Sequence, residues 1–405
     1  MPPTGMFELR AIVGLARLGI ITPFGQRAGV WRARGREKVD YGKAVRKSGP
    51  RRRGAAPPSS RAEAVHRRTR LARKLLKLRA SGRTIYGALD LGTNNCRLLL
   101  ATPARGGFQV VDAFSRIVRL GEGLSVSGRI SDAARQRTLA ALRVCANKLR
   151  WWGVERSRLI ATQACRAAEN GQGFLDQVRE ELGLELEIVD TGTEARLAAS
   201  GACPLIEEGA RDVLVFDIGG GSTELLWMQV DGSERRAADW LSIPVGVVTL
   251  AEKFGGHDIP RPLYEEMRAY VRPMLAEFAA RLRGKGVPGL PDHLLGTSGT
   301  VTTISGVSLG LRRYDRSRVD GCWIERGELA RVSEKLRSMD IRQRAANGCI
   351  GHQRADLVVA GCAIAEEIAA TWPSPRIRVA DRGLREGMLI ELMEEDGTYG
   401  RPQET

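Results

Sequence analysis

The most restrictive feature of this sequence is a run of three glycines between two apolar segments. Residues 213–216 are β-branched or bulky, so they favour a strand that is buried on both faces, and they lead into Asp217. Gly219, Gly220 and Gly221 interrupt that strand, and a second apolar run follows at 225–228. The segment from 212 to 226 is therefore predicted to form a strand, a tight turn and a second strand.

The residues of this turn have the chemistry of a phosphate site. Consecutive glycines expose a row of backbone N–H groups, and such a row can cradle phosphate oxygens. The predicted phosphate-binding residues here are Gly219, Gly220, Gly221, Ser222 and Thr223, of which the last two add hydroxyl donors. Asp217, at the end of the strand, can hold Mg²⁺ or the water around it. A plain glycine hairpin is the alternative, and a single glycine triplet would favour it.

A second segment of the chain repeats the pattern. Residues 86–100 again contain a strand that ends in an aspartate, followed by glycine, by small hydroxyl and amide residues and by another apolar run. The predicted phosphate-binding residues of this segment are Asp90, Gly92, Thr93 and Asn94. Because the pattern occurs twice, two phosphate-binding hairpins are favoured over two plain turns.

Paired hairpins of this kind resemble those of the actin, sugar kinase and heat-shock chaperone superfamily, where they face one another across a cleft. Within that superfamily the chain resembles the exopolyphosphatase and guanosine pentaphosphate phosphohydrolase (Ppx/GppA) family. Besides the hairpins, the matching segments are 162–170, 190–197, 244–250, 354–356 and 381–389, within residues 86–393. The resemblance implies an α/β protein with two ribonuclease H-like, actin-like lobes. Each lobe is expected to be a mixed sheet flanked by helices, with the active site between the lobes.

The resemblance also implies roles for individual residues. Glu194 matches the family's general base, which orients and deprotonates the attacking water. Arg166 matches an arginine that reaches the phosphate chain, and Arg119 is expected to neutralise phosphate charge in the same way. Glu224 is expected at the cleft as a second acid. The carboxylates expected to position the cofactor, Mg²⁺, are Asp90, Asp217 and Glu224.

Glu194 and Arg166 are also compatible with purely structural roles, and the chain departs from the family in places. Glu194 stands near the start of a helix, where the helix dipole favours a carboxylate, and Arg166 taken alone is typical of a surface arginine. Thr193 occupies a position where many members have a second glutamate, and residues 93–95 replace the more usual Ser-Asn-Ser. The chain ends at Thr405, so the helical domain that longer relatives append is not expected.

The net charge of +16 belongs to one end of the chain. Residues 1–84 hold 22 of the 63 Lys and Arg and 4 of the 47 Asp and Glu, which leaves 41 basic and 43 acidic residues in the remainder. Low hydrophobicity and self-repelling charge predict that 1–84 is a disordered extension. It is interpreted as a tether for a polyanion or nucleic acid. The alternatives are a solvated tail, or a start codon assigned too far upstream. The predicted lobes are 85–192, joined by 376–395, and 193–375, followed by a tail at 396–405.

Several classes of protein are disfavoured. No stretch holds 18 uncharged apolar residues, so no membrane association is expected. The seven cysteines include no Cys-x-x-Cys pair, which favours a reducing cytoplasm without a disulfide framework or a zinc site. The four histidines lie in no metalloprotease or triad spacing.

The predicted function is hydrolysis of a terminal phosphoanhydride. Inorganic polyphosphate is the favoured substrate, because the basic extension would attract a long polyanion. The alternatives are guanosine pentaphosphate as the substrate, a kinase of the same superfamily, and a non-catalytic sensor of polyphosphate or of guanosine tetra- and pentaphosphate. A homodimer is considered alongside the monomer.

Overall fold

The computed structural model describes residues 30–32 and 83–400. The predicted disorder of the basic extension therefore falls almost wholly outside the described residues, as does the end of the predicted tail. Within the described ranges, no helix combines the length and the apolarity that a bilayer crossing needs.

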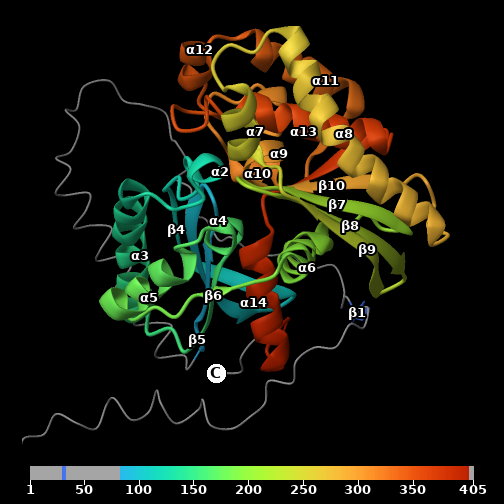
Figure 1. The fold of residues 1–405 in the computed structure, drawn as a ribbon. Coiled ribbons are helices and arrows are strands. Elements are labelled where there is room, and N and C mark those ends of the chain that lie inside the picture. Colours follow the sequence, from blue (N-terminus) through green and yellow to red (C-terminus); the bar gives the residue numbers. More distant parts are fainter. Residues whose placement is uncertain (1–29, 33–82, 401–405) are drawn as a thin grey trace, which may run out of the picture.

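The described strands form two mixed sheets (Figure 1). The strands of the first lobe are β2 (Tyr86–Leu91), β3 (Asn95–Ala104), β4 (Gly107–Ile117), β5 (Arg156–Ala161) and β6 (Glu187–Ile188). The remaining strands are β1 (Val30–Arg32), β7 (Asp212–Ile218), β8 (Thr223–Asp231), β9 (Glu234–Ile243), β10 (His293–Thr297), β11 (Trp323–Glu325) and β12 (Arg376–Ala380). The strand orders are β4-β3-β2-β5-β6 and β1-β9-β8-β7-β10-β12-β11. In each sheet an antiparallel hairpin, β2–β3 or β7–β8, adjoins a parallel neighbour, β5 or β10.

Helices flank both sheets (Figure 1). Those along the first part of the chain are α2 (Leu124–Ser127), α3 (Asp132–Trp152), α4 (Gln163–Ala167), α5 (Gly171–Leu182) and α6 (Thr191–Ala202). The second lobe contains α7 (Val247–Phe254), α8 (Arg261–Gly284), α9 (Ser298–Ser308), α10 (Arg316–Val319), α11 (Arg326–Ser338), α12 (Ile341–Ala346) and α13 (Val358–Thr371). The last helix, α14 (Leu384–Glu395), returns to the first lobe.

The first sheet is buried on both faces because alternate residues of β2 pack in opposite directions. Leu89 belongs to a core cluster with residues of α3 and α5. Its neighbour Ala88 belongs to another cluster, which contains Met388 and Leu389 of α14. Helices on both faces explain why this strand is a continuous apolar run rather than an alternating one.

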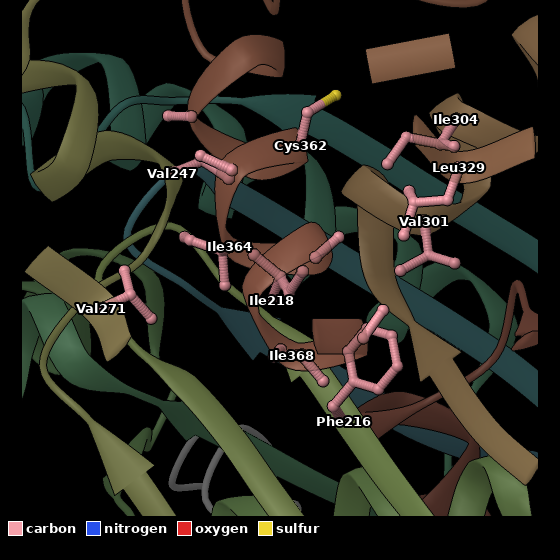
Figure 2. Close-up of a cluster of buried hydrophobic side chains, with 14 of the residues drawn as sticks. Phe216, Ile218, Val247, Val271, Val301, Ile304, Leu329, Cys362, Ile364 and Ile368 are labelled. Atoms are coloured by element: carbon pink, nitrogen blue, oxygen red, sulfur yellow. The ribbon is translucent and has the colours of Figure 1, made fainter. Parts of the chain in front are cut away.

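The second lobe is built around α13, whose first eight residues, 358–365, are all apolar. Only a helix enclosed by other elements can expose so little polar surface. Figure 2 shows Ile364 and Ile368 of this helix close to Phe216 and Ile218 of β7, with Val301 of α9 beside them. This core supports the end of β7, where Asp217 is found.

The boundaries between the lobes differ from the prediction. Strand β12 pairs with β10 in the second sheet, so the predicted return at 376 is wrong for this strand, and only α14 packs on the first lobe. Helix α6 belongs to both lobes, since Leu197 joins the first-lobe cluster and Ala199 joins a cluster on the second sheet. The chain therefore crosses between lobes at α6 and again just before α14.

Candidate active site

The turns of the two predicted hairpins close in the same way. In the first, the N–H of Gly92 donates to the carbonyl of Asn95 at 2.9 Å. In the second, the N–H of Gly219 donates to the carbonyl of Ser222, also at 2.9 Å. Both predicted strand–turn–strand units are confirmed, with four-residue turns at 92–95 and 219–222.

Each hairpin places a charged residue opposite its aspartate. Asp90 lies directly across from Arg97 on β3, and Asp217 lies directly across from Glu224 on β8. Arg97 was not among the predicted site residues. The register of the predicted first hairpin is the signal that would have found it, because residues opposite one another in antiparallel strands share a face of the sheet.

The second turn needs its glycines for close packing against the first lobe. A Cβ on Gly220 would lie 3.0 Å from the Cβ of Thr93 and 3.1 Å from the backbone nitrogen of Asn94. A Cβ on Gly221 would lie 2.0 Å from the side-chain oxygen of Gln163. The tips of the two hairpins are therefore in direct contact, and any larger side chain in the glycine turn would separate them.

A cleft between the lobes, enclosing ≈ 740 Å³ when open solvent is included, brings most of the predicted site together. The predicted residues that line it are Asp90, Gly92, Thr93, Asn94, Glu194, Asp217, Gly219, Gly220, Gly221, Ser222 and Glu224. Residues 381–386, which join β12 to α14, form another wall. In the sequence, these 381–386 residues stood out only as a family match.

Four of the lining carboxylates repel one another in a buried setting. Burial raises the pKa of Asp90, of Asp217 to about 6 and of Glu224 to about 7. Burial followed by repulsion from Glu224 raises the pKa of Glu194 well above its ordinary value. Ser242 on β9 donates to Glu224 at 2.8 Å and opposes the rise in that carboxyl's pKa. This concentration of negative charge is the chemistry of a site for a cation.

Glu194 is held by Arg166. Both terminal nitrogens of Arg166 lie 3.2 Å from one oxygen of Glu194, and one of them also donates to the carbonyl of Val189 at 2.6 Å. Arg166 is absent from the cleft lining, so its guanidinium reaches the cleft through Glu194. The Glu194 side chain remains 12% exposed, which leaves it accessible to a water molecule.

Two predicted phosphate ligands lie elsewhere. Arg119 forms an ion pair with Asp356 at 2.9 Å and donates to the carbonyl of Gln353 at 3.2 Å, at a separate hollow between the lobes. Thr223 is fully buried, and its hydroxyl donates to the carbonyl of Val245 at 2.7 Å. The next residue along the chain on β8, Glu224, points to the cleft because successive strand residues face opposite sides.

Another hollow, distinct from the one at Arg119, adjoins the cleft and is lined by arginine side chains. It shares Asn95, Arg97 and Ser298 with the cleft and is also lined by Arg354. Burial and the nearby Arg97 lower the pKa of Arg354. Among the described residues, neither guanidinium has a hydrogen-bond or ion-pair partner. No local signal connects Arg354 to Arg97, because the two are far apart in the sequence and meet only through the fold.

The residues present suit a hard divalent cation. All the charged donors are carboxylate oxygens, and the side-chain oxygens of Asn94 and Asn95 are buried without a protein partner in the described part of the chain. Within residues 83–400, no three His, Cys, Asp or Glu side chains lie close enough to hold a metal by themselves. A bound Mg²⁺ would therefore take much of its coordination from water and substrate phosphate, as is usual for this ion.

Comparison with known proteins settles the family. The model of the Ppx/GppA phosphatase family matches residues 99–396, which is more than half of the chain. The chain belongs to this family. Exopolyphosphatase 2 from two strains of Mycobacterium tuberculosis is 32% identical over 322 residues, covering 76% of this chain and 98% of that protein.

Solved structures of similar proteins show the same architecture. The Aquifex aeolicus Ppx/GppA protein has a TM-score of 0.64 at 25% identity, covering 78% of this chain and 99% of that one. An exopolyphosphatase-like protein has a TM-score of 0.69 at 28% identity, covering 77% and 99%. An exopolyphosphatase from Cytophaga hutchinsonii, at 23% identity and a TM-score of 0.70, covers 79% and 100% and supports the fold alone. The predicted family and the two-lobed, actin-like fold are confirmed.

Proposed function

We propose that the protein is a Mg²⁺-dependent exopolyphosphatase, which hydrolyses the terminal phosphoanhydride of inorganic polyphosphate and releases orthophosphate. The observation that carries the proposal is the contact of two hairpin turns at a cleft that also holds Glu194 against Arg166. Backbone N–H groups at the turns suit phosphate oxygens, and a buried carboxylate suits the removal of a proton from water. The M. tuberculosis relatives named exopolyphosphatase support the same chemistry.

In this reaction Glu194 acts as the general base. Its carboxylate accepts a proton from a water molecule, whose oxygen bonds to the terminal phosphorus while the bond to the bridging oxygen breaks. The products are orthophosphate and a chain one phosphate shorter. Arg166 fixes the orientation of Glu194, and its charge keeps that carboxyl more acidic than burial alone would. The two turns hold the terminal phosphate in line with the water.

Asp90, Asp217 and Glu224 would hold Mg²⁺ or its coordinated water, since they are the carboxylates at the hairpins. When bound, the ion neutralises charge on the phosphate oxygens. Its presence would also offset the mutual repulsion that raises the pKa values of these buried groups.

The adjoining hollow supports a substrate longer than one phosphate. Arg97 and Arg354 place two guanidinium groups beside the cleft, and a chain of phosphates entering from that side would pair with both. Each unit of polyphosphate carries the same charged phosphate group. The units that follow the terminal one can therefore pair with the arginines of the hollow in the same way.

The test measures phosphate release from long-chain polyphosphate and from guanosine pentaphosphate, with Mg²⁺ and with chelator. The expected result is metal-dependent release from polyphosphate, and a fall in kcat of about 100- to 10,000-fold in Glu194→Gln with binding nearly retained. Preferential release from the pentaphosphate would replace the proposed substrate. Binding of both without release would make the protein a sensor.

A further inference from the structure

We propose that Gln163 contacts the substrate: its side-chain N–H₂ donates to the terminal phosphate, and Thr93 positions it. The inference rests on the proposed function, because it concerns the phosphate held between the two turns. Gln163 is the first residue of α4, lines the cleft and is half-buried. Sequence reasoning gave it no role and assigned the phosphate contact to Thr93.

Thr93 is fixed on all sides. Its side chain is almost fully buried, with 4% of the residue exposed, and its carbonyl accepts a hydrogen bond from the N–H of Gly121 at 2.9 Å. A Cβ on Gly121 would lie only 2.3 Å from the methyl group of Thr93. Its hydroxyl donates to the side-chain oxygen of Gln163 at 3.1 Å. The rotamer of Thr93 is therefore set by the protein before any substrate arrives.

The number of protons available decides which residue can bind phosphate. A threonine hydroxyl has one proton to donate, and a fully ionised phosphate oxygen can only accept. Because Thr93 donates its proton to Gln163, it has none left for the substrate. The amide of Gln163 has two N–H bonds, and its nitrogen has no protein acceptor among the residues that the structure describes.

The amide of Gln163 is also held against the second lobe. Its oxygen lies so close to Gly221 that a Cβ there would approach it to 2.0 Å. The oxygen thus contacts both hairpin turns, on the Thr93 side by a hydrogen bond and on the Gly221 side by packing. With the oxygen fixed in this position, the nitrogen of the same amide is the atom that is left to face the bound phosphate.

Equilibrium binding of inorganic tripolyphosphate with Mg²⁺, measured in the Glu194→Gln protein, tests the proposal without turnover. Gln163→Leu removes the donor without adding charge, and its dissociation constant is expected to rise about tenfold or more, the loss of one hydrogen bond to a charged acceptor. An unchanged dissociation constant in a variant with an unchanged midpoint of thermal unfolding would overturn the proposal.

A double-mutant cycle separates Gln163 from Thr93. If Thr93 acts through Gln163, Thr93→Val weakens binding in the parent protein but has no further effect in the Gln163→Leu background. If the hydroxyl of Thr93 binds phosphate directly, Thr93→Val weakens binding by the same factor in both backgrounds, and the assignment is wrong. In an otherwise wild-type chain, Gln163→Leu is expected to raise KM more than it lowers kcat.

The outcomes also separate this proposal from the proposed function. Tight binding that depends on Gln163, with no phosphate release by the wild-type protein, would remove the proposed reaction and leave the contact. Release of phosphate with no dependence on Gln163 would do the reverse. Absence of tripolyphosphate binding in the Glu194→Gln protein, together with no phosphate release by the wild-type protein, would remove both.

Discussion

Arg166 illustrates how a residue can reach the cleft through another side chain, here Glu194. Its guanidinium holds one oxygen of Glu194 and the carbonyl of Val189 at once, which requires a planar group with several donors. Arg166→Lys keeps the charge but cannot hold both partners in the same geometry. We expect kcat to fall about tenfold or more, with a smaller change in KM, in steady-state kinetics with polyphosphate. A raised KM at unchanged kcat would instead make Arg166 a phosphate ligand, as the sequence predicted.

Glu386 gives a prediction for stability against pH. Burial alone would raise its pKa, but Arg385, Arg316 and the N–H of Gly383 outweigh burial and lower it from 4.5 to about 2. The ionised Glu386 therefore stabilises the folded protein fully at a pH above the ordinary pKa of glutamate. This stabilisation disappears as the pH falls through the lower pKa that Glu386 has in the folded protein. Compared with Glu386→Gln, the wild-type protein should be more stable near neutral pH by an amount on the order of 3 kcal/mol.

Urea titrations of both proteins between neutral and strongly acidic pH measure the difference in the free energy of unfolding. Most other titrating groups are common to both proteins, so their effects cancel in the difference; Asp90, whose pKa Glu386 raises, is the exception. We expect the difference to shrink steadily below about pH 4.5, the ordinary value for glutamate. A difference that stays constant with pH would contradict the assigned ionisation of Glu386.

Helices α6 and α14 connect the lobes, and glycines set how closely they approach. A Cβ on Gly387 would lie 2.0 Å from the carbonyl oxygen of Leu197, and one on Gly201 would lie 2.0 Å from the carbonyl oxygen of Gly383. Backbone cannot yield as a flexible side chain can, so an added methyl group forces the helices apart. Both crossings between the lobes depend on this one contact.

Gly387→Ala is expected to destabilise the protein by about 1–3 kcal/mol and to lower the midpoint of thermal unfolding by several degrees. The matched control is Gly173→Ala in α5, where an added Cβ would meet nothing within 4 Å. That substitution should be neutral or slightly stabilising, because alanine loses less backbone entropy in a helix. Equal effects at both positions would show that the close contact has no energetic weight.

On the scale of the whole molecule, the lobes are joined on both sides of the cleft. The crossing formed by α6 and α14 lies on one side. On the other, the loop before α2 and α2 itself meet the second lobe close to α7 (Figure 1). Here Arg119 bonds to Asp356 at 3.0 Å, and Glu252 accepts from the N–H of Gly123 at 2.8 Å and from the hydroxyl of Ser125. We call these contacts the interlobe latch.

The latch predicts that Arg119 acts on substrate binding through lobe closure. In the Arg119→Asp variant, the new carboxylate at position 119 repels Asp356. The lobes then separate more often, and KM for polyphosphate should rise. The double variant Arg119→Asp, Asp356→Arg restores an ion pair, and aspartate tolerates the positive φ of 48° at position 119. We expect the double variant to recover KM and the compact radius of gyration in solution scattering. A double variant as impaired as Arg119→Asp would return Arg119 to the predicted role of phosphate ligand.

Much of the site could be predicted because it is local. Asp90 and Asp217 stand at the ends of apolar strands and glycines follow, so the hairpins and their turns can be recognised over about 15 residues each. Arg97 was also within reach, since hairpin register places it opposite Asp90. Thr223 shows the limit of this reasoning. Its hydroxyl group suits a phosphate site, but its position in strand β8 directs the side chain into the protein interior, where the hydroxyl donates to the carbonyl of Val245.

The sequence by itself determined the two strand–turn–strand units, the carboxylates at their ends and the family, because short-range backbone preferences and the order of motifs carry that information. The tertiary structure alone decided which side chains meet across the lobes. Gln163 against Gly221, Arg119 on Asp356 and Arg354 beside Arg97 each join residues distant in the chain. Such contacts depend on how two packed lobes are oriented, and that orientation comes from the summed burial at α6 and α14 rather than from any local pattern.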